Sequence, residues 1–328
     1  MQKSFEEIAQ EIRKCHGQDV FIGYSHNSIS DEVHHIYVHL KSFDAWGFGD
    51  GTDPTMALIR AYYESIERIV FHQSGAPTTN GFAAHVTTVE ARVKAAEELI
   101  ERDVFLTSWF CNRPPVWLSP SVIDTTLRSI DPWVLEAITA MEKVGITPRF
   151  GMCGLAQGRI IMAGLMLGAS NTLTIPFGAS VVPGIGSNIA EAIRRLVMDQ
   201  MRILTGIGVR AEELGKFRSS RVNNKIVVDK TMDHLDFYLD LENFDQLKWF
   251  LNDSTREIPQ LPDLDISYED FSIPLETAFP ISVVRAHCPQ AQAYFVGAVN
   301  SERINRSRLG CLGFGDVKEI LAPVHPIP

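Results

Sequence analysis

One pattern occurs twice in this chain, at a constant offset of 34 residues. Gly47-Phe48 begins the first copy and Gly81-Phe82 the second, and in each a helix N-cap residue and then the motif Glu-x-x-Glu-Arg follow. Acids three residues apart project from one side of a helix, so each copy predicts a helix with paired carboxylates. A third predicted helix carries a looser copy with one acid. The equivalent positions are Asp53, Thr87 and Asn188; Arg60, Lys94 and Arg195; Glu64, Glu98 and Asp199; Glu67 and Glu101; and Arg68 and Arg102.

These acids would repel one another if three helices brought them together in a partly buried site, so the site would need cations. Mg²⁺ is the natural candidate, because it is usually held by one or two carboxylates together with phosphate oxygens. The nearby arginines are placed either to meet a triphosphate or to pair with the acids. The pattern alone leaves two alternatives: a nucleotide triphosphate site with several Mg²⁺ ions, or three surface helices with Glu–Arg pairs.

Composition narrows the class of protein. The chain has 328 residues, of which 45% are hydrophobic and 21% charged, as in an ordinary globular protein of one large domain or two. A net charge of −10 argues against nucleic-acid binding, and no apolar run is long enough for a membrane span. The five cysteines form no CxxC pair and are expected to be reduced thiols. The N-terminus has no apolar targeting segment, which predicts a cytoplasmic location.

Capping residues followed by apolar residues at helical spacing predict the helices. In the second copy of the repeat, Val89, Ala96, Leu99, Ile100 and Val104 are expected on the buried side. The predicted helices cover residues 4–15, 54–72, 88–110 and 132–143, and a stretch from 188 onward.

Runs of β-branched and aromatic residues predict strands at 20–24, 35–40, 149–155 and 280–287. Residues 160–167 are of ambiguous type, 171–178 are expected to be extended, and the glycine-rich residues 47–53 are expected to form a turn. The polar stretch 212–265 predicts an excursion or lid, in which Asn243 caps a short helix to about residue 250. The proline-rich end, 322–328, is expected to be an extended tail. Together these elements predict a mixed α+β chain with sheets packed against long helices.

At the repeat, the sequence resembles the YcaO family of ATP-dependent enzymes that activate peptide backbone amides. The resemblance rests on G-x-G-x-x-x-x-P-x-x-A-L-x-R-A-x-x-E-S-I-E-R (Gly47 to Arg68) and on N-G-x-A-A-x-x-T-T-x-E-A…E-L-I-E-R-D (Asn80 to Asp103). E-A-I-R-R-L-V-M-D at 191–199, Val283-Val284-Arg285 and the proline-rich end support it. It implies one YcaO-like domain over residues 1–328, built around a central ATP site.

The resemblance implies that ATP and Mg²⁺ are the cofactors. It places the Mg²⁺ ligands at Glu64, Glu67, Glu98, Glu101 and Asp199. It places nucleotide contacts at Glu90, Arg102 and Arg195, with Lys3 a weak match; Arg60 and Arg68 are candidates from their position near the acids. Three residues depart from the family pattern: Arg60 replaces a serine, Val86 an asparagine, and Asp199 a glutamate.

The proline-rich end is a P-x-x-P-x-P variant of the PxPxP-like end of azoline-forming members, which lies at their active site. The resemblance therefore implies a cyclodehydratase that converts Cys, Ser or Thr of a ribosomal precursor peptide to thiazoline or oxazoline, as in thiazole/oxazole-modified microcin and other antibiotic biosynthesis. The terminal carboxylate of Pro328 or His325 is the expected general base.

Partners follow from the same resemblance. An E1-like protein is expected to bind the leader and deliver the peptide, and a flavin-dependent azoline dehydrogenase to act afterwards. The chain is expected to form a homodimer or part of a hetero-oligomer. Two alternatives stay open: a thioamide- or amidine-forming YcaO enzyme with the same ATP site, and a non-catalytic scaffold or peptide-binding subunit, for which the departures at Arg60, Val86 and Asp199 are the evidence.

Overall fold

The computed structural model divides the chain into two compact units, which are described separately. The first contains residues 1–99 and 265–289, and the second contains residues 100–264 and 290–328. The prediction of a single domain stays a prediction. The structure describes residues 3–25, 32–128, 132–168, 179–217, 234, 237–238, 243–252, 257–297, 299, 301–313 and 325–326.

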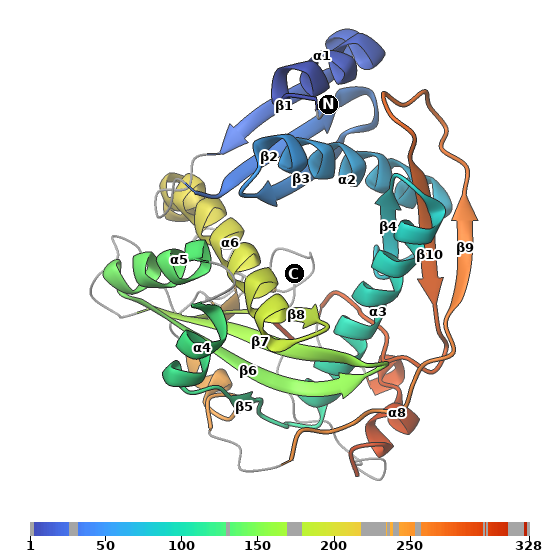
Figure 1. The fold of residues 1–328 in the computed structure, drawn as a ribbon. Coiled ribbons are helices and arrows are strands. Elements are labelled where there is room, and N and C mark those ends of the chain that lie inside the picture. The colour runs from blue at the N-terminus through green and yellow to red at the C-terminus, as the bar shows by residue number, and fades with distance from the viewer. Residues whose placement is uncertain are drawn as a thin grey trace. The chain divides into compact units, whose positions relative to one another are not determined.

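The first unit has two antiparallel three-stranded sheets (Figure 1). In one, the strand order is β1 (Val20–Ser25), β2 (His34–Leu40), β3 (Ala45–Gly51). In the other it is β4 (Phe82–His85), β10 (Ser282–His287), β9 (Ser267–Phe271). The helices are α1 (Phe5–His16), α2 (Pro54–Ser74) and residues 88–99 of α3 (Thr88–Phe110), with short 3₁₀ turns at Gly17–Asp19 and Lys41–Phe43. The buried face of α2 packs on β2 and β3, and with α1 it encloses one apolar core.

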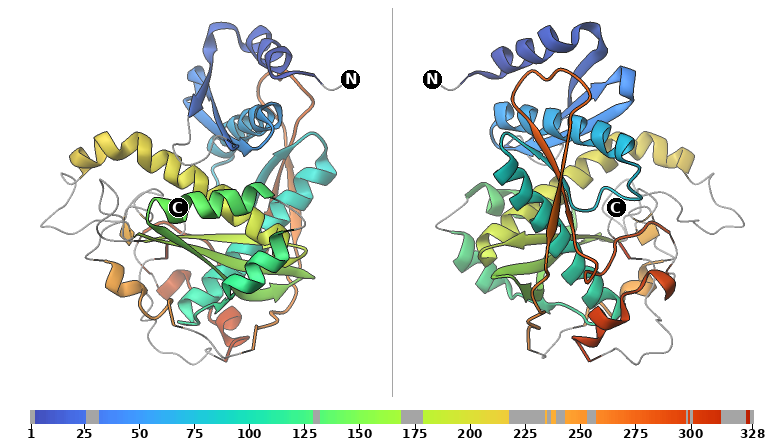
Figure 2. Two further views of the ribbon diagram at one scale, coloured as in Figure 1. Left: turned by 60° about the vertical axis from the view of Figure 1, so that its left-hand side comes forward. Right: turned by 90° about the vertical axis from the view of Figure 1, so that its right-hand side faces the viewer.

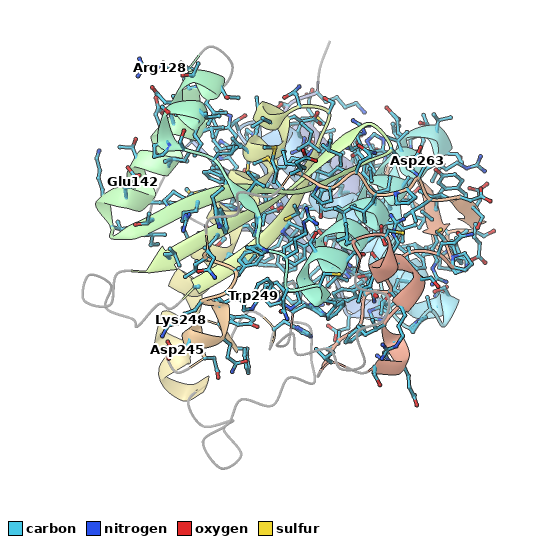
Figure 3. All side chains as sticks on the ribbon, turned by 90° about the horizontal axis from the view of Figure 1, so that it is seen from below. Arg128, Glu142, Asp245, Lys248, Trp249 and Asp263 are labelled. Carbon is cyan, nitrogen blue, oxygen red and sulfur yellow. The ribbon has the colours of Figure 1, made fainter. Side chains whose placement is uncertain are left out.

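The second unit is built on one antiparallel sheet of four strands (Figure 2). Their order is β5 (Val116–Trp117), β6 (Ile146–Ala156), β7 (Arg159–Gly168), β8 (Ala179–Gly186), with a bulge in β6 between Met152 and Gly154. The sheet packs against α5 (Pro132–Lys143) and α6 (Ile189–Phe217), and α4 (Pro120–Leu127) packs against α5. The second half of α3 reaches β6, where the Ser108 hydroxyl donates to the Cys153 carbonyl at 3.2 Å. Two short helical turns at Ser301–Arg303 and Phe244–Leu247 (η3) and the short helix α8 (Arg306–Gly310) complete it. At η3, Lys248 pairs with Asp245 at 2.8 Å beside Trp249 (Figure 3).

The structure gives the sequence repeat a physical form. Each copy is a strand followed by a helix, namely β3–α2, β4–α3 and β8–α6, and in every copy the helix begins three residues after the last strand residue. The predicted N-caps are confirmed. The side chain of Asp53 accepts the N–H of Thr55 at 2.8 Å, that of Thr87 accepts the N–H of Glu90 at 3.2 Å, and Asn188 accepts the N–H of Glu191 at 2.9 Å.

The predicted glycine-rich turn at 47–53 is wrong, because most of it forms strand β3. Two of its glycines lie directly under α2. A Cβ on Gly47 would lie 2.0 Å from the carbonyl oxygen of Ala61, and a Cβ on Gly49 would lie 1.8 Å from that of Ala57. These glycines therefore let the helix backbone rest on the strand.

The buried side of α3 also differs from the prediction. Val89 is 72% exposed and Ala96 is only partly buried. The predicted Leu99, Ile100 and Val104 are buried, together with Ala91 and Ala95, which were not predicted. Strand β4, which precedes this helix, was not predicted, and the helix at Asn243 is only a 3₁₀ turn without a side-chain cap.

The remaining predicted helices and strands are confirmed to within a few residues, and 160–167 is a strand. Residues 171–178, most of 218–242 and Pro328 lie outside the described residues. In the described part of the chain, no helix is long and apolar enough to cross a membrane.

Candidate active site

The first acid pair of the repeat is held by the edges of two sheets. Glu64 accepts the backbone N–H of Phe48, on edge strand β3, at 3.0 Å. Glu67, one turn further along α2, accepts the N–H of Ala84, on edge strand β4, at 3.1 Å. Arg68 donates to the other oxygen of Glu64 at 2.9 Å. The strands therefore fix where both carboxylates of α2 lie.

Glu67 shows that these acids are close enough to interact strongly. Its partial burial raises its pKa well above the usual range, and the charges of Glu98 and Glu64 raise it further, against the opposing effect of Arg68. Three of the five predicted metal ligands are thus brought together in the first unit. Such a group is destabilised unless a proton or a cation compensates it.

The group has the donor chemistry that Mg²⁺ requires. All of its donors are carboxylate oxygens, the ligand type that a hard cation prefers. Within the described residues, however, no three His, Cys, Asp or Glu side chains converge tightly enough to hold a metal ion by themselves. The arrangement therefore fits ions that take part of their coordination from phosphate and water, as Mg²⁺ commonly does.

Glu90 lies at the start of α3, one turn after the end of β4. It accepts the hydroxyl of Thr87 at 2.7 Å and the Nδ1 of His85 at 3.0 Å. The Thr87 hydrogen bond and the nearby His85 lower the pKa of this exposed carboxyl. Glu90 is therefore a carboxylate at a helix N-terminus, hydrogen-bonded to the hydroxyl of the residue that caps the helix.

Two predicted basic residues of the first unit have other partners. Arg60 donates to the backbone carbonyl of Asp50 at 2.6 Å, at the end of β3. Lys3 pairs with Glu11 on α1 at 2.5 Å, and its ammonium lies 5.9 Å from the centre of the Phe279 ring.

In the second unit, the third copy of the repeat is internally paired. Arg195 donates to Glu191 at 2.9 Å, and Asp199 pairs with Arg202 at 3.0 Å. Partial burial raises the pKa of Glu191, but hydrogen bonds from Ser187 and Arg195 outweigh this effect and lower the pKa to about 2. Arg202 occupies the position of the second acid in the other copies, so a cation of the protein replaces a carboxylate here.

Glu101 and Arg102 follow one turn after Glu98 on α3. The guanidinium of Arg102 lies over the ring of Tyr294, 4.6 Å from its centre. The next residue, Asp103, is fully buried and forms a bidentate ion pair with Arg308 of α8, whose Nε and terminal nitrogen lie 2.9 and 2.5 Å from Oδ2. The backbone N–H of Gln292 donates to Oδ1 at 2.7 Å.

His325 is fully buried, and its Nε2 donates to the backbone carbonyl of Phe295 at 2.6 Å. Because a carbonyl cannot donate, Nε2 carries the proton, which leaves Nδ1 as the basic nitrogen of this ring, and the role of His325 as the base stays a prediction. The carbonyl of His325 in turn accepts from Nδ1 of His234 at 2.6 Å, and the two rings stack. Pro328, the other predicted base, lies outside the described residues, so its role stays a prediction.

Sequence reasoning did not find His234, Tyr294 or Arg308. Their contacts with His325, Arg102 and Asp103, respectively, each join residues more than 90 positions apart, so no local spacing connects them.

Known proteins that are similar to this chain identify its family. A family model described as YcaO cyclodehydratase, ATP- and Mg²⁺-binding, matches residues 70–278, well over half of the chain. The chain belongs to the YcaO family. Its cofactors are ATP and Mg²⁺, it is an ATP-dependent enzyme, and the predicted family and fold class are confirmed. No curated protein sequence matches the chain significantly.

Several solved structures share the YcaO fold. YcaO from Methanopyrus kandleri, bound with AMPPCP and Mg²⁺, aligns with a TM-score of 0.58 over 90% of this chain and 94% of its own, at 12% identity. A heterocyclase in complex with substrate and cofactor aligns with a TM-score of 0.59 over 89% of this chain at 12% identity, but over only 53% of its own length. A chain of the E. coli microcin synthetase McbBCD complex aligns with a TM-score of 0.55 at 11% identity, over 82% of this chain and 88% of its own. At such identities the likeness concerns the fold alone.

Proposed function

We propose that this YcaO enzyme is a cyclodehydratase that converts Cys, Ser or Thr residues of a precursor peptide to azolines. The observation that carries the proposal is the group formed by Glu64, Glu67 and Glu98, in which the pKa of Glu67 is raised by burial and by the other two charges. A protein keeps such a group at a cost in stability, which a bound cation offsets. Two of the structures that share the fold, a heterocyclase and a microcin synthetase, support this type of reaction.

In the proposed reaction, the side-chain oxygen or sulfur of the substrate attacks the preceding amide carbon and gives up its proton. The amide oxygen takes the γ-phosphoryl group and ADP leaves. The nitrogen then loses its proton and forms the C=N bond, while the oxygen departs as phosphate. ATP supplies the phosphoryl group that makes this oxygen a leaving group, and Mg²⁺ neutralises charge on the phosphates.

The residues of the chain would position and neutralise. Glu64, Glu67, Glu98, Glu101 and Asp199 would supply oxygens to the ions. The contacts described above hold Glu64, Glu67 and Asp199. Arg102 and Arg195 would pair with phosphate oxygens, for which a planar guanidinium is suited. In this structure Asp199 is paired with Arg202, and Arg195 with Glu191. These ion pairs would have to weaken when nucleotide and Mg²⁺ bind.

A peptide substrate and a separate leader-binding protein are part of the proposal. The heterocyclase structure contains a substrate, and the microcin synthetase is a complex of several proteins. An azoline dehydrogenase would act on the product.

Replacing Glu67 by Gln tests the proposal through thermal stability, nucleotide binding and turnover. The amide oxygen of Gln can still accept the N–H of Ala84, so the change removes the charge but not the hydrogen bond. We expect the nucleotide-free variant to melt at a higher temperature than the parent, because repulsion with Glu64 and Glu98 is relieved. The stabilisation by Mg²⁺ with a non-hydrolysable ATP analogue should disappear, and peptide-dependent phosphate release should fall about 100-fold or more.

Glu142→Gln is the matched control, because Glu142 is an exposed acid on α5 and its replacement should change none of the three measurements (Figure 3). If Glu67→Gln binds Mg²⁺ and nucleotide like the parent protein, the metal assignment is wrong. If the parent chain with its leader-binding partner binds no nucleotide at all, the protein is a scaffold.

A further inference from the structure

One segment of the second unit contacts four other places in the chain. Residues 290–297, here called the bracket segment, follow β10. The backbone N–H of Gln292 donates to Asp103 on α3, and its side-chain oxygen accepts the N–H of Asn305, just before α8. The carbonyl of Phe295 accepts from His325, and the N–H of Gly297 donates to Nε2 of His234.

Tyr294 lies at the centre of this segment and is 6% exposed. The guanidinium of Arg102 lies 4.6 Å from the centre of its ring. The ring of His325 lies 5.3 Å from it, centre to centre, at an interplanar angle of 53°. One aromatic ring is therefore in contact with the arginine of the second Glu-x-x-Glu-Arg motif and with the buried C-terminal residues.

The contact with Arg102 is directional. A guanidinium over the face of an aromatic ring is attracted to the ring's negative face, and the attraction is strongest where water is excluded, as it is around Tyr294. The next residue, Asp103, is held by Arg308 and by Gln292 of the bracket segment. The side chains of Arg102 and Asp103, neighbours on α3, are therefore both held by the bracket segment.

We infer that Tyr294 is a positioning residue, which orients Arg102 toward the nucleotide and couples that orientation to the seating of the C-terminal residues at His325. This inference rests on the proposed function, because it takes Arg102 to be a nucleotide contact. Tyr294 would act through Arg102 and would not touch the nucleotide itself.

Nucleotide affinity tests the inference, measured by isothermal titration of the full chain with Mg²⁺ and a non-hydrolysable ATP analogue. Tyr294→Leu removes the aromatic face, and we expect the dissociation constant to rise about 10-fold or more. Tyr294→Phe keeps the face and should bind like the parent. Phe150→Leu is the control for lost packing, because Phe150 is a buried ring on β6. Its melting temperature should fall, as for Tyr294→Leu, but its affinity should not.

His325→Gln tests the coupling. Gln can still donate to the carbonyl of Phe295, but it has no ring to place against Tyr294. We expect weaker nucleotide binding in the single variant and no further loss when the change is added to Tyr294→Leu, because contacts that act through one ring are not additive. Full additivity of the two changes would disprove the coupling.

Three outcomes separate this inference from the proposed function. If Arg102→Gln binds nucleotide like the parent, the assignment of Arg102 fails. If Arg102→Gln weakens binding and Tyr294→Leu does not, only the present inference fails. It also fails if Phe150→Leu loses as much affinity as Tyr294→Leu, because Tyr294 is then merely part of the core. Should Tyr294→Leu not fold, Tyr294→Met, which keeps most of the volume, gives the same comparison.

Discussion

Replacing Asp103 by Asn should strongly destabilise the second unit. The carboxylate of Asp103 is completely buried, and it accepts hydrogen bonds from Nε and a terminal nitrogen of Arg308 and from the N–H of Gln292. Asn has nearly the same shape, but it turns one acceptor into a donor that faces the guanidinium. Arg308, only 4% exposed, is then left as a buried charge without its counter-ion.

The expected loss follows from that burial. Breaking a buried ion pair by removing one partner costs about 3–5 kcal/mol, because the remaining charge stays desolvated. Burial also raises the pKa of Asp103, against the effect of Arg308, so the carboxylate pays a desolvation cost even in the native pair. Replacing both residues together, as Asp103→Leu with Arg308→Met, should therefore cost less than Asp103→Asn alone.

Urea unfolding followed by tryptophan fluorescence is a suitable assay, because four of the five tryptophans lie in the second unit. Asp124→Asn is the control. It makes the same chemical change at an Asp–Arg pair of the same unit, on α4, but this pair is exposed and should shift the unfolding midpoint little (Figure 3). A loss below about 1 kcal/mol for Asp103→Asn would refute the reasoning, because an uncompensated buried charge cannot be that mild.

Two further predictions concern the helix N-terminus in the third copy of the repeat and the strand under the helix in the first copy. Glu191→Gln should lower the free energy of unfolding by about 1–2 kcal/mol at pH 7. This is less than the lowering of the Glu191 pKa on folding would imply, because the carboxyl is partly exposed. The pKa of Glu191 is lowered in the folded state, so this stabilisation is present above about pH 4.5 and is lost as the pH falls toward 2. Urea unfolding of parent and variant at pH 7 and pH 3 measures the difference in stability. A difference that does not shrink at pH 3 would contradict the prediction. Gly49→Ala should lower the free energy of unfolding by at least about 3 kcal/mol, because the new Cβ would overlap the Ala57 carbonyl. Gly51→Ala should lower it by less than about 1 kcal/mol, because the nearest atom to its new Cβ is the end of a flexible side chain at 3.4 Å. Equal melting temperatures for the two alanine variants would contradict the overlap.

The repeat was the part of the fold that the sequence predicted best, because its information is local. An N-cap residue and its hydrogen-bond partner are two or three positions apart, and paired acids are one turn apart. Asp53, Thr87 and Asn188 were therefore identified without any knowledge of tertiary contacts, and the helices that they cap begin where expected.

The errors arose where tertiary packing decides the structure. Gly47 and Gly49 are typical of a turn in isolation, but they lie in a strand because α2 requires a surface without side chains. Val89 fits the apolar spacing of its helix, yet the packed side of α3 is set by Ala91 and Ala95, whose small side chains are fully buried.

The candidate site divides in the same way. The acids were predicted from the sequence, and the group formed by Glu64, Glu67 and Glu98 agrees with that prediction, while their roles stay proposals. The residues that fix the site could not be predicted. Arg308 lies 205 residues after Asp103, and only the folded chain brings them together.

The hydrogen bonds of Glu64 and Glu67 have a consequence for how the family diverges. Each carboxylate accepts an N–H from an edge strand, so it also shields an edge that would otherwise be open to pairing with another chain. A descendant that no longer used ATP would still have reason to retain an acceptor at both positions, and glutamine would serve as well as glutamate. If Glu64 and Glu67 hold Mg²⁺ as proposed, their charge, rather than the presence of a hydrogen-bond acceptor, would distinguish an active enzyme from an inactive relative with the same architecture.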